Sequence, residues 1–102
     1  MRRLLNPPVD PVSQLSGFDP SGRYQLDPDV AVRPEPFGAL AYHYGSRRLT
    51  FLRSRLLADL VADLGNHDSV DAALEAAVPE NQRRSYRNAL ASLAESRFIR
   101  AC

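Results

Sequence analysis

The chain has 102 residues, enough for one small domain and too few for a second hydrophobic core. The formal net charge is +1, from 13 basic residues that are all arginine and 12 acidic residues, so the positive excess typical of nucleic-acid-binding proteins is absent. A single cysteine, Cys102, excludes an internal disulfide framework, and no stretch approaches the roughly 20 apolar residues that span a bilayer. These properties predict a soluble cytoplasmic protein that does not associate with membranes.

Residues 1–22 are predicted to form a flexible N-terminal arm ahead of a domain at residues 23–102. Pro, Ser, Gly and Asp dominate the arm, four prolines interrupt any helix, and the apolar residues show no period. The apolar run near its start is only Leu4 and Leu5, far shorter than the core of a secretory signal. We therefore interpret the arm as a disordered or loosely docked tail, and docking of its few apolar residues on a partner is the alternative.

Residues 23–52 show the pattern of β-strands. Residues 23–26 are an extended lead-in that ends at the turn residues 27–29. Residues 30–33 alternate with period two, and prolines end this strand near residue 35. Residues 38–44 alternate again, as do residues 47–52 after a Gly45-Ser46 turn. The pattern predicts an antiparallel meander of three strands.

The alternation assigns the side chains of the last two strands to the two faces of the sheet. In the second strand the two sets are Leu40, Tyr42 and Tyr44, and Ala39, Ala41 and His43. In the third strand they are Leu49 and Phe51, and Arg48, Thr50 and Leu52. No later partner is evident for the third strand, so we expect it at the edge of the sheet.

Three helices are predicted after the strands. Ser54 is the candidate N-cap of the first, and Asp68 or Ser69 caps a second that a proline stops. A third helix follows that proline, and Phe98 and Ile99 then fold back on the core. The predicted fold class is α+β, a three-stranded antiparallel sheet followed by three helices in the order β-β-β-α-α-α.

The exposed edge strand carries the main functional prediction. An unpaired row of N–H and C=O groups accepts an added strand from another chain, as in many peptide-binding modules. About four main-chain hydrogen bonds at roughly 0.5–1.5 kcal/mol each give only a few kcal/mol, whereas a micromolar complex needs roughly 8 kcal/mol. Side chains must therefore contribute to peptide binding as well.

Three blocks of the sequence carry a family resemblance. They are Val30-x-Val32-Arg33-Pro34-Glu35-Pro36-Phe37-Gly38-Ala39-Leu40-x-Tyr42-His43, Arg48-Leu49-Thr50-Phe51-Leu52-Arg53-Ser54, and Tyr86-x-x-Ala89-Leu90-x-x-Leu93. The chain resembles the peptide chaperones of mycofactocin biosynthesis, which belong to the wider group similar to the pyrroloquinoline-quinone peptide chaperone. The resemblance covers about residues 24–99 and implies a winged-helix-like recognition element for ribosomally made, modified peptides.

The resemblance also implies a binding mode and partners. The leader of a precursor peptide would add as a strand to residues 48–52, and the third helix, within residues 83–97, would form the other wall of a groove. The chaperone would deliver the peptide to a radical S-adenosylmethionine maturase. It would catalyse nothing and hold no cofactor, metal or iron–sulfur cluster, which agrees with the single cysteine.

Carried onto this sequence, the binding mode selects candidate peptide-binding residues on the strand and on the helix. They are Arg48, Leu49, Thr50, Phe51, Leu52, Arg53, Arg84, Arg87, Leu90, Ala91 and Ala94. The small and apolar residues would let a peptide approach closely, and the arginines would pair with acidic leader residues. Core packing for the apolar residues and a solvated basic face for the arginines are the alternatives.

The sequence is also compatible with a second function and with an oligomeric state. The stretch Asn81-Gln82-Arg83-Arg84-Ser85-Tyr86-Arg87-Asn88 opens the third helix with residue types that read phosphates and base edges, so a winged-helix nucleic-acid-binding protein is the alternative function. The exposed edge strand also predicts a possible homodimer by edge-to-edge pairing.

An enzyme is not expected. His43 and His67 are isolated and have no Cys or carboxylate at the spacing of metal ligands. The sequence also contains no glycine-rich phosphate-binding loop.

Overall fold

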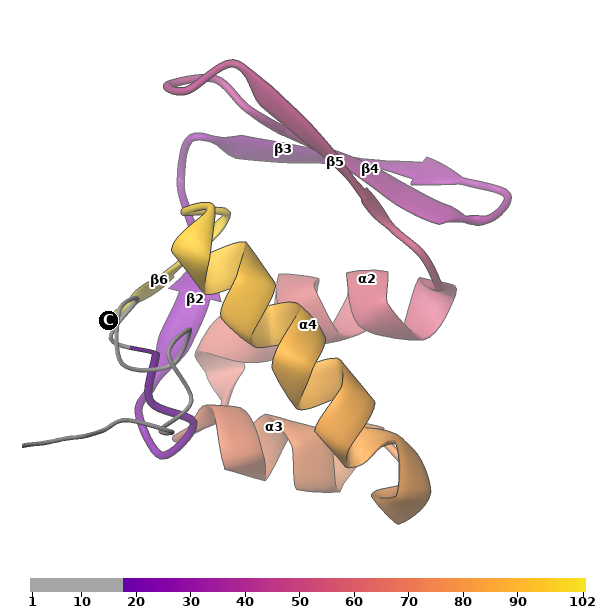
Figure 1. The fold of residues 1–102 in the computed structure, drawn as a ribbon, viewed down its shortest axis with the longest axis vertical. Coiled ribbons are helices and arrows are strands. Elements are labelled where there is room, and N and C mark those ends of the chain that lie inside the picture. Colours follow the sequence, from indigo (N-terminus) through magenta and orange to yellow (C-terminus); the bar gives the residue numbers. More distant parts are fainter. Residues whose placement is uncertain (1–17) are drawn as a thin grey trace, which may run out of the picture.

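The structure is a computed structural model that describes residues 18–102. It contains the strands β2 (Tyr24–Leu26), β3 (Val30–Glu35), β4 (Gly38–His43), β5 (Arg48–Leu52) and β6 (Ile99–Ala101). The helices are α2 (Arg55–Asp63), α3 (Val70–Ala77) and α4 (Arg83–Glu95), with short 3₁₀ turns η1 (Leu64–Asn66) and η2 (Glu80–Gln82). The three-stranded sheet lies over one side of the helical cluster (Figure 1). The predicted α+β class and its element order are confirmed.

The larger sheet has the strand order β3-β4-β5, so β5 is an edge strand as predicted. In its register, Ala41 of β4 pairs with Val32 of β3 and with Thr50 of β5. The turn into β5 is closed by the N–H of Arg47, which donates to the carbonyl of His43 at 2.7 Å. The side chains of β4 that face the helices are buried, which confirms the predicted alternation.

The helices begin where hydroxyl side chains cap them. Ser54 Oγ accepts a hydrogen bond from the N–H of Leu57 at 3.0 Å at the start of α2. Ser69 Oγ accepts from the N–H of Ala72 at 2.9 Å, so Ser69, not Asp68, caps α3. After α3 the chain makes the turn η2, and α4 begins at Arg83, a few residues after the predicted start at about Pro79 or Glu80.

A second sheet, which the sequence analysis did not predict, joins the two ends of the domain. Strand β2 pairs antiparallel with β6, and Leu26 lies opposite Ile99. The chain reverses between α4 and β6 at Arg97, whose φ of 67° is left-handed. Each strand has only three residues, too few to show a reliable period in the sequence.

The described chain begins inside the predicted arm. Phe18 is buried against the core, and the carbonyls of Pro20 and Gly22 accept hydrogen bonds from the N–H groups of Asp71 and Val70 at 3.0 Å each. Residues 18–22 are therefore packed against the start of α3. The rest of the predicted arm, residues 1–17, lies outside the described residues.

The core fills the space between the helices and the inner face of the three-stranded sheet. Helix α2 packs against β4 and β5, and α3 packs against α4. The largest fully buried side chains are Leu52, Leu64, Leu74, Leu90, Ile99, Val61 and Val70. Because the helices cover only one face of this sheet, its other face and the edge of β5 lie outside the core (Figure 1).

Candidate binding groove

A groove of about 510 Å³ lies between β5 and α4. Thr50, Phe51 and Leu52 line its strand side. The residues that line its helix side are Ser85, Tyr86, Ala89, Ser92 and Leu93. Arg53, Ser54, Leu57, Ser96 and Phe98 complete the lining. The groove therefore runs beside β5, one of the two edge strands of the three-stranded sheet.

The deepest residues of the groove are apolar, and its helix wall is low. Leu52, Leu93 and Phe98 are all buried, and their side chains belong to the core beneath the groove. Ala89 and Ser92 on α4 are small, so they leave space above that floor. An extended segment with one or two apolar side chains fits such a surface better than a charged or bulky ligand does.

A hydrogen bond joins the two walls at one end of the groove. Ser54 Oγ lies 3.0 Å from the Tyr86 hydroxyl, and it also accepts from the N–H of Leu57. The same hydroxyl therefore caps α2 and connects the end of β5 with α4. This link sets the spacing of the walls near Arg53.

Gly38 holds the strand wall in place through its missing side chain. Its φ of 152° is rarely adopted by other residues, and a Cβ added there would collide with the carbonyl oxygen of Leu52 and lie 2.9 Å from the nitrogen of Ser54. Because of this close approach, the β3–β4 turn packs against the junction of β5 and α2. The sequence pattern predicted only that a strand begins at Gly38.

The structure brings part of the predicted site together. Thr50, Phe51, Leu52 and Arg53 all line the groove. Arg48 and Leu49 belong to the same strand without lining the groove, and the Leu49 side chain is exposed on the opposite face of the sheet.

The predicted helix residues lie on a different row of α4 from the one that lines the groove. Leu90 is fully buried in the core, and Ala91 and Ala94 are packed against the core. None of the three is among the residues that line the groove. The lining row that the sequence analysis missed repeats at three and four residues, Ser85/Tyr86, Ala89, Ser92/Leu93 and Ser96, which is a recognisable face of a helix.

Helix α3 engages two of the arginines near the start of α4. Arg83 donates from Nε to the carbonyl of Val78 at 2.8 Å, which caps the end of α3, and Arg87 pairs with Asp71 at 3.2 Å. Arg84 is exposed and does not line the groove. Arg53 is the one charged residue that lines the groove within the part of the chain that the structure describes.

Each of the two histidines has a polar partner, and neither belongs to a cluster of metal-binding side chains. His43 is buried, and its Nδ1 accepts a hydrogen bond from the N–H of Ser46 at 3.2 Å. His67 lies 3.0 Å from a carboxylate oxygen of Asp63. Residues 18–102 contain no group of three or more His, Cys, Asp or Glu side chains arranged to hold a metal ion. No helix in that range has the length and apolar character needed to cross a membrane.

An open strand edge beside a groove with an apolar floor is the geometry of domains that take an extended peptide as an added strand. The fold and the groove thus define a small α+β domain of the peptide-binding class. Comparison with known proteins agrees with this class, since residues 23–100 match the peptide chaperone MftB family. The chain belongs to this family, which confirms the resemblance seen in its sequence and the prediction of a chaperone that is not an enzyme.

Curated relatives support the assignment over most of the chain. The peptide chaperone MftB of Mycobacterium ulcerans (strain Agy99) is 43% identical over 97% of this chain and 94% of its own length. The protein of the same name from Mycolicibacterium smegmatis is 43% identical over 86% of this chain and 87% of its own length. No solved structure matches the chain at a significant level.

Proposed function

We propose that this protein is a cytoplasmic, non-catalytic peptide chaperone of mycofactocin biosynthesis. It binds the leader of a ribosomally made precursor peptide and delivers the peptide to a radical S-adenosylmethionine maturase. Membership of the peptide chaperone MftB family supports the general function. The open edge of β5 beside the groove is the observation that carries the proposed binding mode.

In the proposed complex the leader adds as a strand to β5. Its backbone pairs with the N–H and C=O groups that point outward from alternate residues of β5, and alternate side chains enter the groove. Burying one apolar side chain there contributes about 1.5–3 kcal/mol, which adds to the few kcal/mol from main-chain hydrogen bonds and helps to offset the cost of association. Arg53 at the rim pairs with an acidic leader residue.

An NMR titration tests this function directly. The isotope-labelled chain is titrated with the precursor peptide encoded beside its gene, and the backbone amides are followed. We expect saturable shifts that concentrate in residues 48–54 and 85–96. The absence of shifts at a large excess of peptide would contradict leader binding, and shifts confined to other segments would contradict the groove.

Thr50→Pro tests the added strand itself. Thr50 pairs with Ala41 of β4, so proline there disturbs this pairing and restricts the backbone of the edge strand, and we expect peptide affinity to fall by about tenfold or more. Arg2→Ala, outside the domain, is the control that retains affinity. Circular dichroism checks that both variants fold. Equal losses in two folded variants would rule out strand addition.

Ala89→Arg tests the helix wall without changing a strand. A long side chain at this position fills the groove from the α4 side, and we expect it to weaken peptide binding by about tenfold. Ala76→Arg, the same change at an exposed position of α3, is the matched control. Isothermal titration calorimetry measures both. Wild-type affinity in Ala89→Arg would place the peptide elsewhere.

Edge-to-edge dimerisation is a separate proposal that uses the same strand. A dimer formed through β5 would cover the peptide site, so the peptide should dissociate it. Sedimentation velocity with and without the precursor peptide measures this competition. A dimer that persists with saturating peptide does not use the β5 edge.

A further inference from the structure

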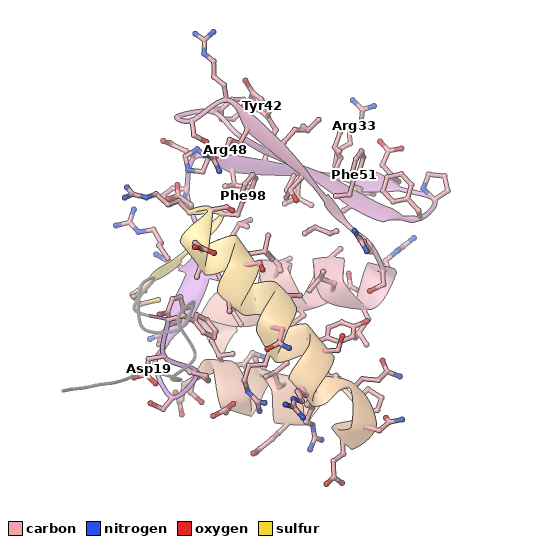
Figure 2. The ribbon with its side chains drawn as sticks, viewed as in Figure 1. Asp19, Arg33, Tyr42, Arg48, Phe51 and Phe98 are labelled. Atoms are coloured by element: carbon pink, nitrogen blue, oxygen red, sulfur yellow. The ribbon has the colours of Figure 1, made fainter. Side chains whose placement is uncertain are left out.

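The outer face of the three-stranded sheet, turned away from the helices, gathers large apolar side chains. Among residues 18–102, the exposed large hydrophobic residues are Phe37, Tyr44, Leu49 and Phe51, with exposed fractions between 49% and 61%. All of them lie in β5 or in the turns next to β4. Tyr42 projects from the same side of the sheet, away from α4 (Figure 2). This gathering is more than the scattered apolar exposure of an ordinary surface.

The strand register makes these residues one continuous surface. Tyr42 lies opposite Leu49, and Leu40 lies opposite Phe51, so their side chains share a face. Phe37 packs edge-on against Phe51 with ring centroids 5.6 Å apart, which extends the surface past the β3–β4 turn. Tyr42 and Tyr44 make a similar contact at 5.1 Å toward the other end. We call this surface the outer face.

The strand rows at the centre of the outer face carry no net charge, and the exposed residues Arg47, Arg48 and Arg53 border this face along β5. The charged residues in its strand rows are Arg33 and Glu35, and they pair with each other at 3.1 Å between Nε and Oε2. A nucleic acid or a strongly acidic protein therefore finds no unpaired charge at the centre of this face. Exposed aromatic side chains without net charge are typical of the centre of a protein–protein interface.

The outer face is continuous with the edge where the peptide is proposed to bind. Phe51 of the edge strand β5 belongs to both surfaces, because its ring packs against Phe37 on the outer face and the residue also lines the groove on the α4 side of the strand. A peptide strand added to β5 would send every second side chain to the outer face and extend it. A partner on the outer face thus reaches both the chaperone and the bound peptide and leaves the groove occupied.

We propose that the outer face is the docking surface for the enzyme that modifies the bound peptide, and that the enzyme contacts it through an uncharged, apolar surface. This inference rests on the proposed function, because it requires a chaperone that delivers a peptide to an enzyme. Docking on the outer face explains how one small domain holds the peptide and the enzyme at the same time.

Two substitutions test the proposal away from the peptide groove. Phe37→Asp and Tyr44→Asp each place a charge on the outer face outside β5, and Ala76→Asp on α3 is the matched control. Affinity for the purified radical S-adenosylmethionine enzyme of the same gene cluster is measured with precursor peptide present. We expect each outer-face variant to weaken enzyme binding by about tenfold or more, and the control to retain it. Affinity for the free precursor peptide should stay at the wild-type value.

The outcomes separate this proposal from the proposed function. Wild-type enzyme affinity in both outer-face variants would overturn it. So would a wild-type dimer that these variants dissociate while enzyme binding stays intact, because the outer face would then serve a second copy of the chain. If the wild-type protein does not bind the precursor peptide in the parallel titration, that result would instead contradict the proposed function. Phe37→Ser and Tyr44→Ser replace the aspartates if circular dichroism reveals misfolding.

Discussion

The two faces of the three-stranded sheet differ in side-chain size at the middle strand β4, although Leu52 of β5 is also buried on the inner face. The face toward the helices carries the small residues Ala39 and Ala41, each only 1% exposed, whereas Leu49 and Phe51 on the outer face are 56% and 60% exposed. Small inner side chains let α2 pack closely on β4. The larger side chains are left outside, where they contribute little to the core. Stability thus depends on the inner face, and the outer face remains available for contact with other molecules.

A substitution at Gly38, where the chain passes close to the end of β5, should have the largest effect on stability. Gly38→Ala forces a left-handed φ of 152° on a residue with a Cβ and drives that Cβ into the backbone of Leu52 and Ser54. We expect a loss of about 3 kcal/mol or more in the free energy of unfolding, measured by urea denaturation. If the variant does not fold at all, loss of the dispersed amide NMR spectrum gives the same answer.

Gly45→Ala is the control for that substitution. A Cβ at Gly45 would meet the side chains of His43 and Asp29 at 3.1 and 3.3 Å, and these move more easily than backbone does. We expect a change within about 1 kcal/mol. Similar losses at the two glycines would show that the backbone contact of Gly38 is not special.

Substitutions that change side-chain size on each face of the sheet compare how much the two faces contribute to stability. Ala41→Leu overfills the inner face beneath the helices and should cost about 1–3 kcal/mol. Leu49→Ala removes an exposed side chain from the outer face and should change stability by no more than about 0.5 kcal/mol. Thermal and urea unfolding of the two variants measure the contrast. Equal costs would mean that both faces contribute alike to the core.

The link between the groove walls predicts a smaller effect. Ser54→Ala removes the cap of α2 and the bond to Tyr86, and should cost about 1–2 kcal/mol. Tyr86→Phe removes only the bond and should cost about 0.5–1.5 kcal/mol. A double-mutant cycle by urea denaturation isolates the coupling. Strict additivity would indicate that the two hydroxyls do not interact.

The smallest effect concerns pH at a site remote from both faces. The hydrogen bond from the Asn66 amide to the Asp63 carboxylate, followed by that from His67, lowers the pKa of Asp63 below its ordinary value of 3.8. A lowered carboxyl pKa stabilises the fold above the unfolded value, and this contribution is lost as pH falls through the folded value. Carbon-detected NMR titration of Asp63 should give a pKa below 3.8. In Asn66→Ala the pKa should move back toward 3.8.

Most helices and strands were predictable from the sequence because their signals are local. The alternation of Ala39 to His43 and the hydroxyl caps at Ser54 and Ser69 depend on residues within one or two turns of the chain. The strand half of the groove was also found, since an edge strand follows from the order of the elements. The helix residues predicted from the sequence lie one row away from those that line the groove. The apolar period of α4 does not distinguish the row that packs into the core from the row beside β5.

The sequence alone thus determined the α+β order, the edge position of β5, the family and the two-faced character of the sheet, because these follow from periodicity, turn residues and local motifs. Only the tertiary structure decided that Leu26 pairs with Ile99, that Tyr86 bonds Ser54, and that Gly38 must lack a side chain. It also decided which row of α4 faces the groove. Each of these depends on segments that meet only when the chain has folded, and no pattern within one segment records which distant atoms it will touch.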